Sequence, residues 1–226
     1  MSAPTSPARE LELEQQRRAP AFLRRPFGII RANARVYLLL NLLAYGLVAI
    51  GMVIGMLFPD LTAGRAESLE ADGTGDFVRS LISSPWLFAA VILVVNLFQM
   101  SLLTVVLPSL VIPFVGILTF SVWAVVTGVT IVPGDAQGWV AMIPHSLTLV
   151  IELQAYVLVL LGVFLLGKQW LRPAAVGERT HRRGYLRGLQ SLGWLAIPAL
   201  ILLVIGAVWE SFSLLYLVYP LQQWLL

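Results

Sequence analysis

The most regular feature of the sequence is a series of long apolar runs separated by short polar segments. Between Pro85 and Val132 the chain carries no Asp, Glu, Lys or Arg. Because one spanning helix uses about 20 apolar residues, this run is too long for one span and suits two. Pro108 and Pro113 mark the expected break, although a proline can also kink a helix without ending it.

These runs predict an all-α fold, a polytopic transmembrane helix bundle with five spanning helices. The expected spans lie at about 36–57, 86–107, 110–131, 145–167 and 192–209. Residues 60–84, which contain five acids, and residues 133–144 are expected to form loops. Residues 211–226 are apolar and aromatic, but they are short and are interrupted by Pro220. They predict an interfacial or re-entrant tail instead of a sixth span.

The composition agrees with a membrane protein and narrows the chemistry. Hydrophobic residues make up 58% and charged residues 12% of the chain, whereas about 25% of a typical soluble domain is charged. The chain therefore lacks the charge needed to cover an ordinary water-facing surface. Cysteine is absent, which excludes disulfides, thiolate metal sites and cysteine nucleophiles.

The basic residues gather in two clusters, one before the first span and one between the last two. Seven lie in the first 35 residues and six between residues 168 and 187, while only Arg65 and Arg79 lie elsewhere. Basic residues beside apolar segments favour the cytoplasmic side of a membrane. Five spans with the N-terminus cytoplasmic and the C-terminus outside place both clusters on that side. The same placement indicates the lipid bilayer of the cell membrane as the partner, and no nucleic acid.

The chain divides into a basic tail at 1–35 and a membrane domain at 36–226. Residues 1–20 include three acids, Glu10, Glu12 and Glu14, and are expected to be disordered or loosely helical. Residues 21–35 mix arginines with apolar side chains, which is typical of an interfacial amphipathic helix on anionic lipid. A solvated basic tail is the alternative.

The clearest anomaly within an apolar run is Glu152, about seven residues into the expected fourth span. A charged side chain at the centre of a spanning helix costs at least about 2.5–3.5 kcal/mol. His145 and Thr148 precede it at offsets that place all three on one helical face. Seven residues of helix rise about 10 Å, so His145 and Glu152 cannot pair directly on a straight helix. The stripe either handles protons or substrate in a cavity, or fixes helix packing through a bond from Glu152 to the second span.

Other polar and small residues complete the candidate intramembrane site. Asn96 and Gln99 lie on roughly one side of the second span, where interhelical hydrogen bonding is their expected role. Glu210 ends the fifth span, and we expect it to be partly buried. Gly51 and Gly55 form a small-xxx-small pair in the first span. Such a pair predicts a close helix contact or, alternatively, a homo-oligomer interface.

Motifs of familiar catalytic centres are missing from the sequence. It has no P-loop, no His-Glu-x-x-His and no Gly-x-Ser-x-Gly. Its two histidines, His145 and His181, are too few for a histidine-rich metal site. We therefore expect a protein that is not an enzyme and that binds no cofactor and no metal.

Four segments between about residues 31 and 220 resemble the stage II sporulation protein M (SpoIIM-like) family. They read RANARVYLLL, VVNLFQMSLLTVVLPSLVIPFVGILTF, IPHSLTLVIELQAYVLVLLGVFLLG and GAVWESFSLLYLVYP. In that family the His and Glu of the third segment lie about one turn apart and a glycine follows the His. Here Ser146 follows His145, and Glu152 comes seven residues later. The resemblance implies a multi-span protein that works in a complex with other membrane or envelope proteins.

Two functions follow as hypotheses. The first is a non-enzymatic scaffold of a cell-envelope complex, which holds its partners through loops and an intramembrane polar face. The second is a permease-like transport component that works with a separate ATPase. A dry bundle with Glu152 bonded to Asn96 or Gln99 favours the scaffold, whereas a water-filled cavity reaching Glu152 favours transport.

Overall fold

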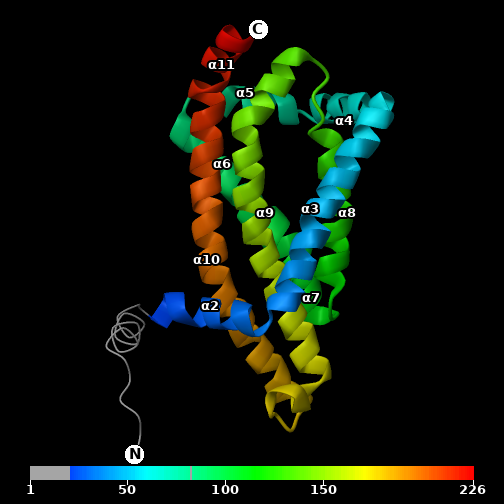
Figure 1. The fold of residues 1–226 in the computed structure, drawn as a ribbon, viewed down its shortest axis with the longest axis vertical. Helices are drawn as coiled ribbons and strands as arrows, with labels where there is room; N and C mark the ends of the chain where they lie inside the picture. The colour runs from blue at the N-terminus through cyan, green and yellow to red at the C-terminus, as the bar shows by residue number, and fades with distance from the viewer. Residues whose placement is uncertain (1–20, 82) are drawn as a thin grey trace, which may run out of the picture.

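The computed structural model describes residues 21–81 and 83–226 and shows an elongated bundle of helices (Figure 1). The elements are α2 (Ala21–Ala32), α3 (Ala34–Leu57), α4 (Pro59–Ala71), α5 (Thr74–Leu81), α6 (Pro85–Val94), the π-helix η1 (Val95–Val106), α7 (Leu107–Val111), α8 (Val115–Thr130), α9 (Ala136–Leu171), the short 3-10 helix η2 (Pro173–Val176), α10 (His181–Tyr216) and α11 (Val218–Leu225). No strand occurs in the described ranges, so the predicted all-α class is confirmed. The acidic group at Glu10, Glu12 and Glu14 lies outside the described residues.

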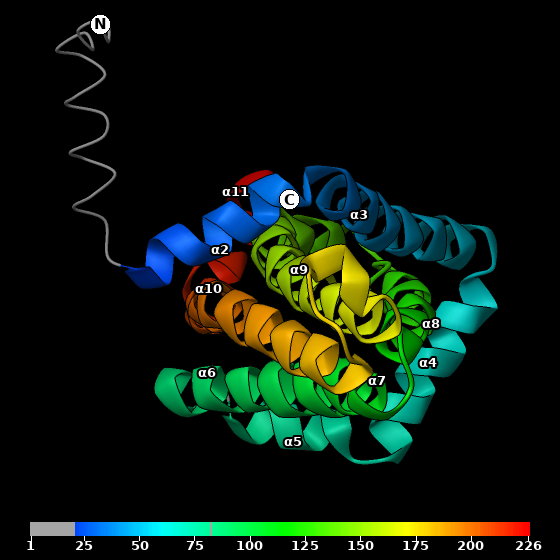
Figure 2. The same cartoon turned by 90° about the horizontal axis from the view of Figure 1, so that it is seen from below.

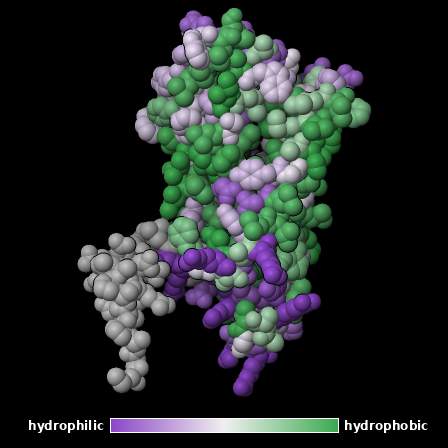
Figure 3. Space-filling model, viewed as in Figure 1, coloured by the Kyte–Doolittle hydropathy of each residue, from purple (hydrophilic) through white to green (hydrophobic). Residues whose placement is uncertain are grey.

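Four helical stretches are long and apolar enough to cross a membrane. They are α3 with 24 residues, the continuous stretch α6–η1–α7 with 27, and α9 and α10 with 36 each. Their side chains leave much apolar surface exposed, and Figure 3 shows hydrophobic side chains over much of one face, around a smaller hydrophilic patch and above a hydrophilic lower end. The protein is therefore a multi-span membrane protein. The expected third span corresponds to α8, which has only 16 residues, so five crossings stay a prediction.

The loop expected over residues 133–144 is wrong from residue 136 onward, because α9 begins at Ala136. The Asp135 carboxylate accepts a hydrogen bond from the Gly138 amide at 2.7 Å and caps the helix start, as a favourable N-cap residue does. Pro144 lies inside the helix. The expected loop at 60–84 is also wrong, since α4 and α5 occupy most of it.

The break between the second and third apolar helices lies at residues 112–114, so it contains Pro113, one of the two prolines expected to mark it. Pro108 is inside the helical stretch, which ends at Val111, and Phe114 then adopts a left-handed conformation with φ 68°. Pro108 cannot donate a backbone hydrogen bond to the preceding turn. The Thr104 carbonyl instead accepts a bond from the Thr119 hydroxyl of α8 at 2.6 Å. A polar side chain of the neighbouring helix thus makes the proline tolerable here.

The helix α9 lies at the centre of the bundle, with α3, α8, α10 and the α6–α7 stretch around it (Figure 2). The most apolar part of α9 is 67% buried, a far larger share than in the other three candidate spans. Glycines bring α9 and α10 close together. A Cβ atom added to Gly188 would lie 2.6 Å from the Leu166 Cα, and one added to Gly162 would lie 2.5 Å from the Leu192 Cδ1. The closely packed α9–α10 pair forms the core of the bundle, and it carries His145, Glu152 and Glu210.

The predicted glycine pair of the first span packs within the chain, against α8. A Cβ atom on Gly51 would lie 2.2 Å from the Val125 carbonyl oxygen, and one on Gly128 would lie 2.2 Å from the Val48 carbonyl oxygen. Gly55 has a tight neighbour in the Val129 carbonyl oxygen, 3.0 Å from its would-be Cβ. Small residues therefore allow the two backbones to touch.

The last part of the chain is helical. The α10 helix starts at His181 and runs to Tyr216, beyond both expected ends of the fifth span. The expected tail is divided between the end of α10 and α11, and the Gln222 side-chain amide donates to the Gln137 carbonyl at 3.0 Å. At the opposite end of the bundle, α2 lies across the helices (Figure 1).

The polar helices α4 and α5 are joined by one exposed ion pair, Arg79 with Glu70, and a second pair, Arg79 with Asp76, lies within α5. The Arg79 guanidinium lies 2.8 Å from a Glu70 carboxylate oxygen and 2.7 Å from an Asp76 carboxylate oxygen. The hydrogen bonds from Arg79 lower the pKa of Glu70 below its ordinary value of 4.5. Because the folded pKa is the lower one, this pair favours the folded state above about pH 4.5. That contribution is lost as the pH falls through the lowered pKa.

Replacing Arg79 with Gln is expected to return the pKa of Glu70 to its ordinary range, because the charged donor is removed. Carbon-13 NMR titration of labelled glutamate in micelles measures this pKa. Arg65→Gln is the matched control, since Arg65 forms no ion pair with Glu70 in the structure. An unchanged Glu70 pKa in Arg79→Gln would show that the α4–α5 ion pair does not form.

Candidate functional site

Four of the polar residues singled out in the sequence meet between η1, α9 and α10. The Asn96 side-chain amide donates a hydrogen bond to the Glu152 carboxyl group. The His145 Nδ1 atom lies 3.7 Å from a Glu210 carboxylate oxygen, within ion-pair distance if the imidazole is protonated. Glu210 also lies close enough to Glu152 for the two carboxyl groups to interact electrostatically. We call Asn96, His145, Glu152 and Glu210 the polar cluster.

The helix α9 supplies the two central members of this cluster at different heights. His145 and Glu152 face neighbouring elements and bind different partners, as their seven-residue spacing requires. Gly206 of α10 provides the room for Glu152, because an added Cβ atom there would lie 3.2 Å from the Glu152 Cγ. The glutamate is thus held against the backbone of one neighbouring helix and bonded to a side chain of another.

Gln99 does not join the cluster. It is exposed, whereas Asn96 is half-buried and Ser101 is buried. The sequence expectation assumed α-helical periodicity, but residues 95–106 form a π-helix in which hydrogen bonds reach five residues back. The Ser101 hydroxyl follows this register and donates to the Asn96 carbonyl at 2.9 Å. In the wider turn, residues three apart no longer share a face, so Gln99 rotates away from Glu152.

Two buried hydroxyl groups on α9 lack a hydrogen-bond partner in the described part of the chain. They belong to Thr148 and Tyr156, each 1% exposed, which lie four residues before and four residues after Glu152. Tyr156 also packs edge-on against Trp123 of α8, with ring centroids 5.3 Å apart. Thr148 was expected from the sequence. Tyr156 was missed, although its spacing from Glu152 places it on the same side of the helix.

A second polar group, between α3 and α9, was also missed by sequence reasoning. The Tyr37 hydroxyl donates to the Gln154 side-chain carbonyl at 2.7 Å, and the Gln154 amide donates to the Asn41 side-chain oxygen at 2.7 Å and to the Tyr45 hydroxyl at 2.9 Å. Tyr37, Asn41 and Tyr45 recur every four residues on the first span, which is the pattern that could have revealed them. They bind α3 to the central helix.

Hydrogen bonds from side chains to backbone carbonyls connect the helices that carry the polar cluster. The Trp209 indole N–H donates to the Pro144 carbonyl at 3.1 Å. The Ser211 hydroxyl donates to the Pro85 carbonyl at 2.6 Å. Since Trp209 and Ser211 flank Glu210, these bonds fix α10 against both α9 and α6 at the height of His145.

The cluster can join helices or exchange protons, and the described residues offer little other chemistry. Each carboxyl group has a polar neighbour on another element, which offsets the cost of placing it among apolar side chains. His145 and Glu210 are a base and an acid near enough to share a proton through small movements. The described residues include no group of three His, Cys, Asp or Glu side chains placed to hold a metal ion.

Comparison of the chain with protein-family models, with curated proteins and with solved structures found no match. The class that the fold defines is the multi-span membrane protein, with a polar cluster at the junction of three helical elements.

Proposed function

We propose that this protein is a non-enzymatic scaffold of a cell-envelope complex, organised by its polar cluster. The observation that carries this proposal is that the cluster residues bond to one another across helices. Asn96 of η1 binds Glu152 of α9, and His145 of α9 faces Glu210 of α10. Such pairing stiffens the bundle, and a stiff bundle presents a fixed surface to partner proteins.

Membership of the stage II sporulation protein M (SpoIIM-like) family is part of this proposal. It is supported by the position of the residues that carry the resemblance, because Asn96, His145, Glu152 and Glu210 come from three distant segments and meet at one place. The altered spacing after His145 also has a physical counterpart, since its partner is Glu210 and not Glu152. What this resemblance suggests is a set of partners in an envelope complex, and it does not by itself imply a role in sporulation.

Crosslinking and affinity capture of the intact protein from its own membrane test the scaffold. We expect envelope proteins to co-purify with the natural chain and to be lost from Glu152→Gln, because the variant replaces the carboxyl group that accepts the hydrogen bond from Asn96. Glu67→Gln is the matched control, since Glu67 is exposed on α4. Equal recovery of the same partners from Glu152→Gln and the natural protein would contradict an organising role for the cluster.

One observation favours a permease-like transport component as the second candidate. The partnerless hydroxyls of Thr148 and Tyr156 flank Glu152 along α9 and could bind water or a transported polar group. Two results together would favour this function over the scaffold. The natural protein would capture a nucleotide-binding subunit, and Glu152→Gln would keep this assembly but lose transport activity.

We further propose five crossings with the N-terminus cytoplasmic. Support comes from the arrangement of charge, because α2 and the basic α9–α10 connection share one end of the bundle while α4 and α5 lie at the other (Figure 1). The chain has no natural cysteine, so single cysteines give a clean label. We expect Glu67→Cys to react with an impermeant maleimide on intact cells and Arg179→Cys to react only after permeabilisation. The reverse pattern would invert the protein.

A further inference from the structure

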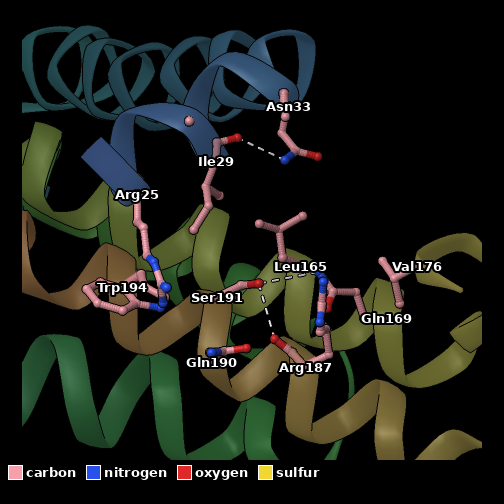
Figure 4. A pocket seen from close by; sticks show the side chains of 12 residues that line it. Arg25, Ile29, Asn33, Leu165, Gln169, Val176, Arg187, Gln190, Ser191 and Trp194 are labelled. Atoms are coloured by element: carbon pink, nitrogen blue, oxygen red, sulfur yellow. Dashed lines mark hydrogen bonds between the residues drawn. The ribbon is translucent and has the colours of Figure 1, made fainter. Parts of the chain in front are cut away.

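A hollow lies at the end of the bundle where α2 crosses α9 and α10, well separated along the chain from the polar cluster. Its volume is about 610 Å³. Figure 4 shows side chains of three elements around it: Arg25 and Ile29 from α2, Leu165 and Gln169 from α9, and Arg187, Ser191 and Trp194 from α10. One part of the lining is cationic and amide-bearing, and another is apolar.

The cations of this hollow have no acidic partner among the described residues. The Arg25 guanidinium lies over the Trp194 ring, 4.7 Å from its centroid. Neither Arg25 nor Arg187 forms an ion pair with a described carboxylate. The stacking holds one charge in a fixed position, and the second lies across the hollow on α10. Two such guanidinium groups suit a phosphate, to which Arg donates well-oriented hydrogen bonds.

A buried amide in the same lining has an unused acceptor. Gln169 is 7% exposed, and its side-chain oxygen has no hydrogen-bond partner in the described structure. Its side-chain nitrogen donates weakly to the Ser191 hydroxyl at 3.5 Å, and that hydroxyl donates to the Arg187 carbonyl at 3.2 Å. A buried acceptor left unpaired is costly. A hydroxyl group of a ligand in the hollow would satisfy it once the Gln169 side chain turned its oxygen toward the hollow.

We propose that this hollow binds the headgroup of an anionic phospholipid that carries free hydroxyls, the chemistry of phosphatidylglycerol. Arg25 and Arg187 hold the phosphodiester, and the Gln169 oxygen accepts from a glycerol hydroxyl. The helix α2 is amphipathic and crosses the end of apolar helices, which is where headgroups lie in a bilayer. The acyl chains would then lie along the exposed apolar side chains of the bundle.

Native mass spectrometry of the delipidated full chain, titrated with phosphatidylglycerol, tests the cationic half of the site. We expect one tightly bound lipid, and about 30-fold weaker binding in the double variant Arg25→Gln/Arg187→Gln, from about fivefold for each arginine. The control is Arg31→Gln/Arg182→Gln, which removes the same charge from the same two helices outside the lining. Equal weakening in both double variants would overturn the site, because the loss of net charge would then explain the weaker binding without any contact in the hollow.

Phosphatidylmethanol tests the amide half, because it has the same phosphodiester charge and no headgroup hydroxyl. We expect Gln169→Met to weaken phosphatidylglycerol about threefold to fivefold and to leave phosphatidylmethanol unchanged. Equal affinity of the natural protein for both lipids would contradict the assigned role of Gln169.

Free anions distinguish a lipid from a soluble ligand. We expect that neither inorganic phosphate nor glycerol 3-phosphate at millimolar concentration displaces the lipid, because acyl chains add to its binding. Displacement by either one would overturn the lipid assignment and indicate a soluble phosphate ligand for the same residues.

Discussion

Gly51→Leu is expected to lower the free energy of unfolding by about 3 kcal/mol or more. The cause is a contact between backbones, because a Cβ atom on Gly51 would lie 2.2 Å from the Val125 carbonyl oxygen and 2.9 Å from the Gly128 Cα. A flexible side chain could move aside, but a helix backbone can do so only if α3 separates from α8. The variant therefore loses the packing between these two helices. Reversible unfolding in mixed micelles measures the change.

Gly46→Leu is the matched control for this variant. Gly46 lies on the same helix, and an added Cβ atom there meets nothing within 4 Å, so we expect a change within about 0.5 kcal/mol. Equal stability of the two variants would show that α3 and α8 do not touch at Gly51. We also expect Gly51→Leu to leave the oligomeric size unchanged, since the glycine pair is used within one chain.

Asn96→Leu is expected to lower the free energy of unfolding by about 2 kcal/mol, because it leaves the Glu152 carboxyl group buried without its hydrogen-bond donor. Gln99→Leu is the control on the same helix. Gln99 is exposed and lies outside the polar cluster, so its replacement with an apolar residue is expected to be neutral or slightly stabilising in a lipid-like environment.

A double-mutant cycle separates the hydrogen bond from the burial of each group. Glu152→Leu alone leaves the Asn96 amide unpaired, and we expect the combination with Asn96→Leu to recover most of the lost stability. Additive losses from the two single variants would mean that Asn96 and Glu152 do not interact in the folded protein.

The helical class and the central polar residues could be predicted because they depend on local composition. Apolar runs of about 20 residues specify helices in a bilayer, and Glu152 stands out in any such run. Asn96 was named from the sequence as a possible bonding partner of Glu152, and the structure brings the two together. The possible close contact of Gly51 and Gly55 likewise followed from their four-residue spacing, while the identity of their neighbour α8 did not.

The remaining features depend on backbone geometry that composition does not encode. The π-helix at 95–106 turns Gln99 outward, and no residue type in that segment predicts the wider turn. Pro108 was expected to mark a break and Pro144 to close a loop, but both lie inside helices. A hydroxyl from α8 satisfies the carbonyl freed at Thr104, and the Asp135 cap starts α9 before Pro144. The pairing of His145 with Glu210 required knowing that α9 and α10 are neighbours.

Labelling of Glu152→Cys with a charged, water-soluble maleimide tests the scaffold proposal most directly. The chain has no other cysteine. In permeabilised vesicles the reagent reaches the aqueous surfaces on both sides of the membrane. Glu67→Cys, on exposed α4, is the positive control, and unfolding in detergent shows that the thiol at 152 is present. If the polar cluster is a dry junction between helices, the cysteine at 152 stays unlabelled until the protein unfolds. Rapid labelling in the folded protein would contradict the scaffold and show a water-filled path to this residue.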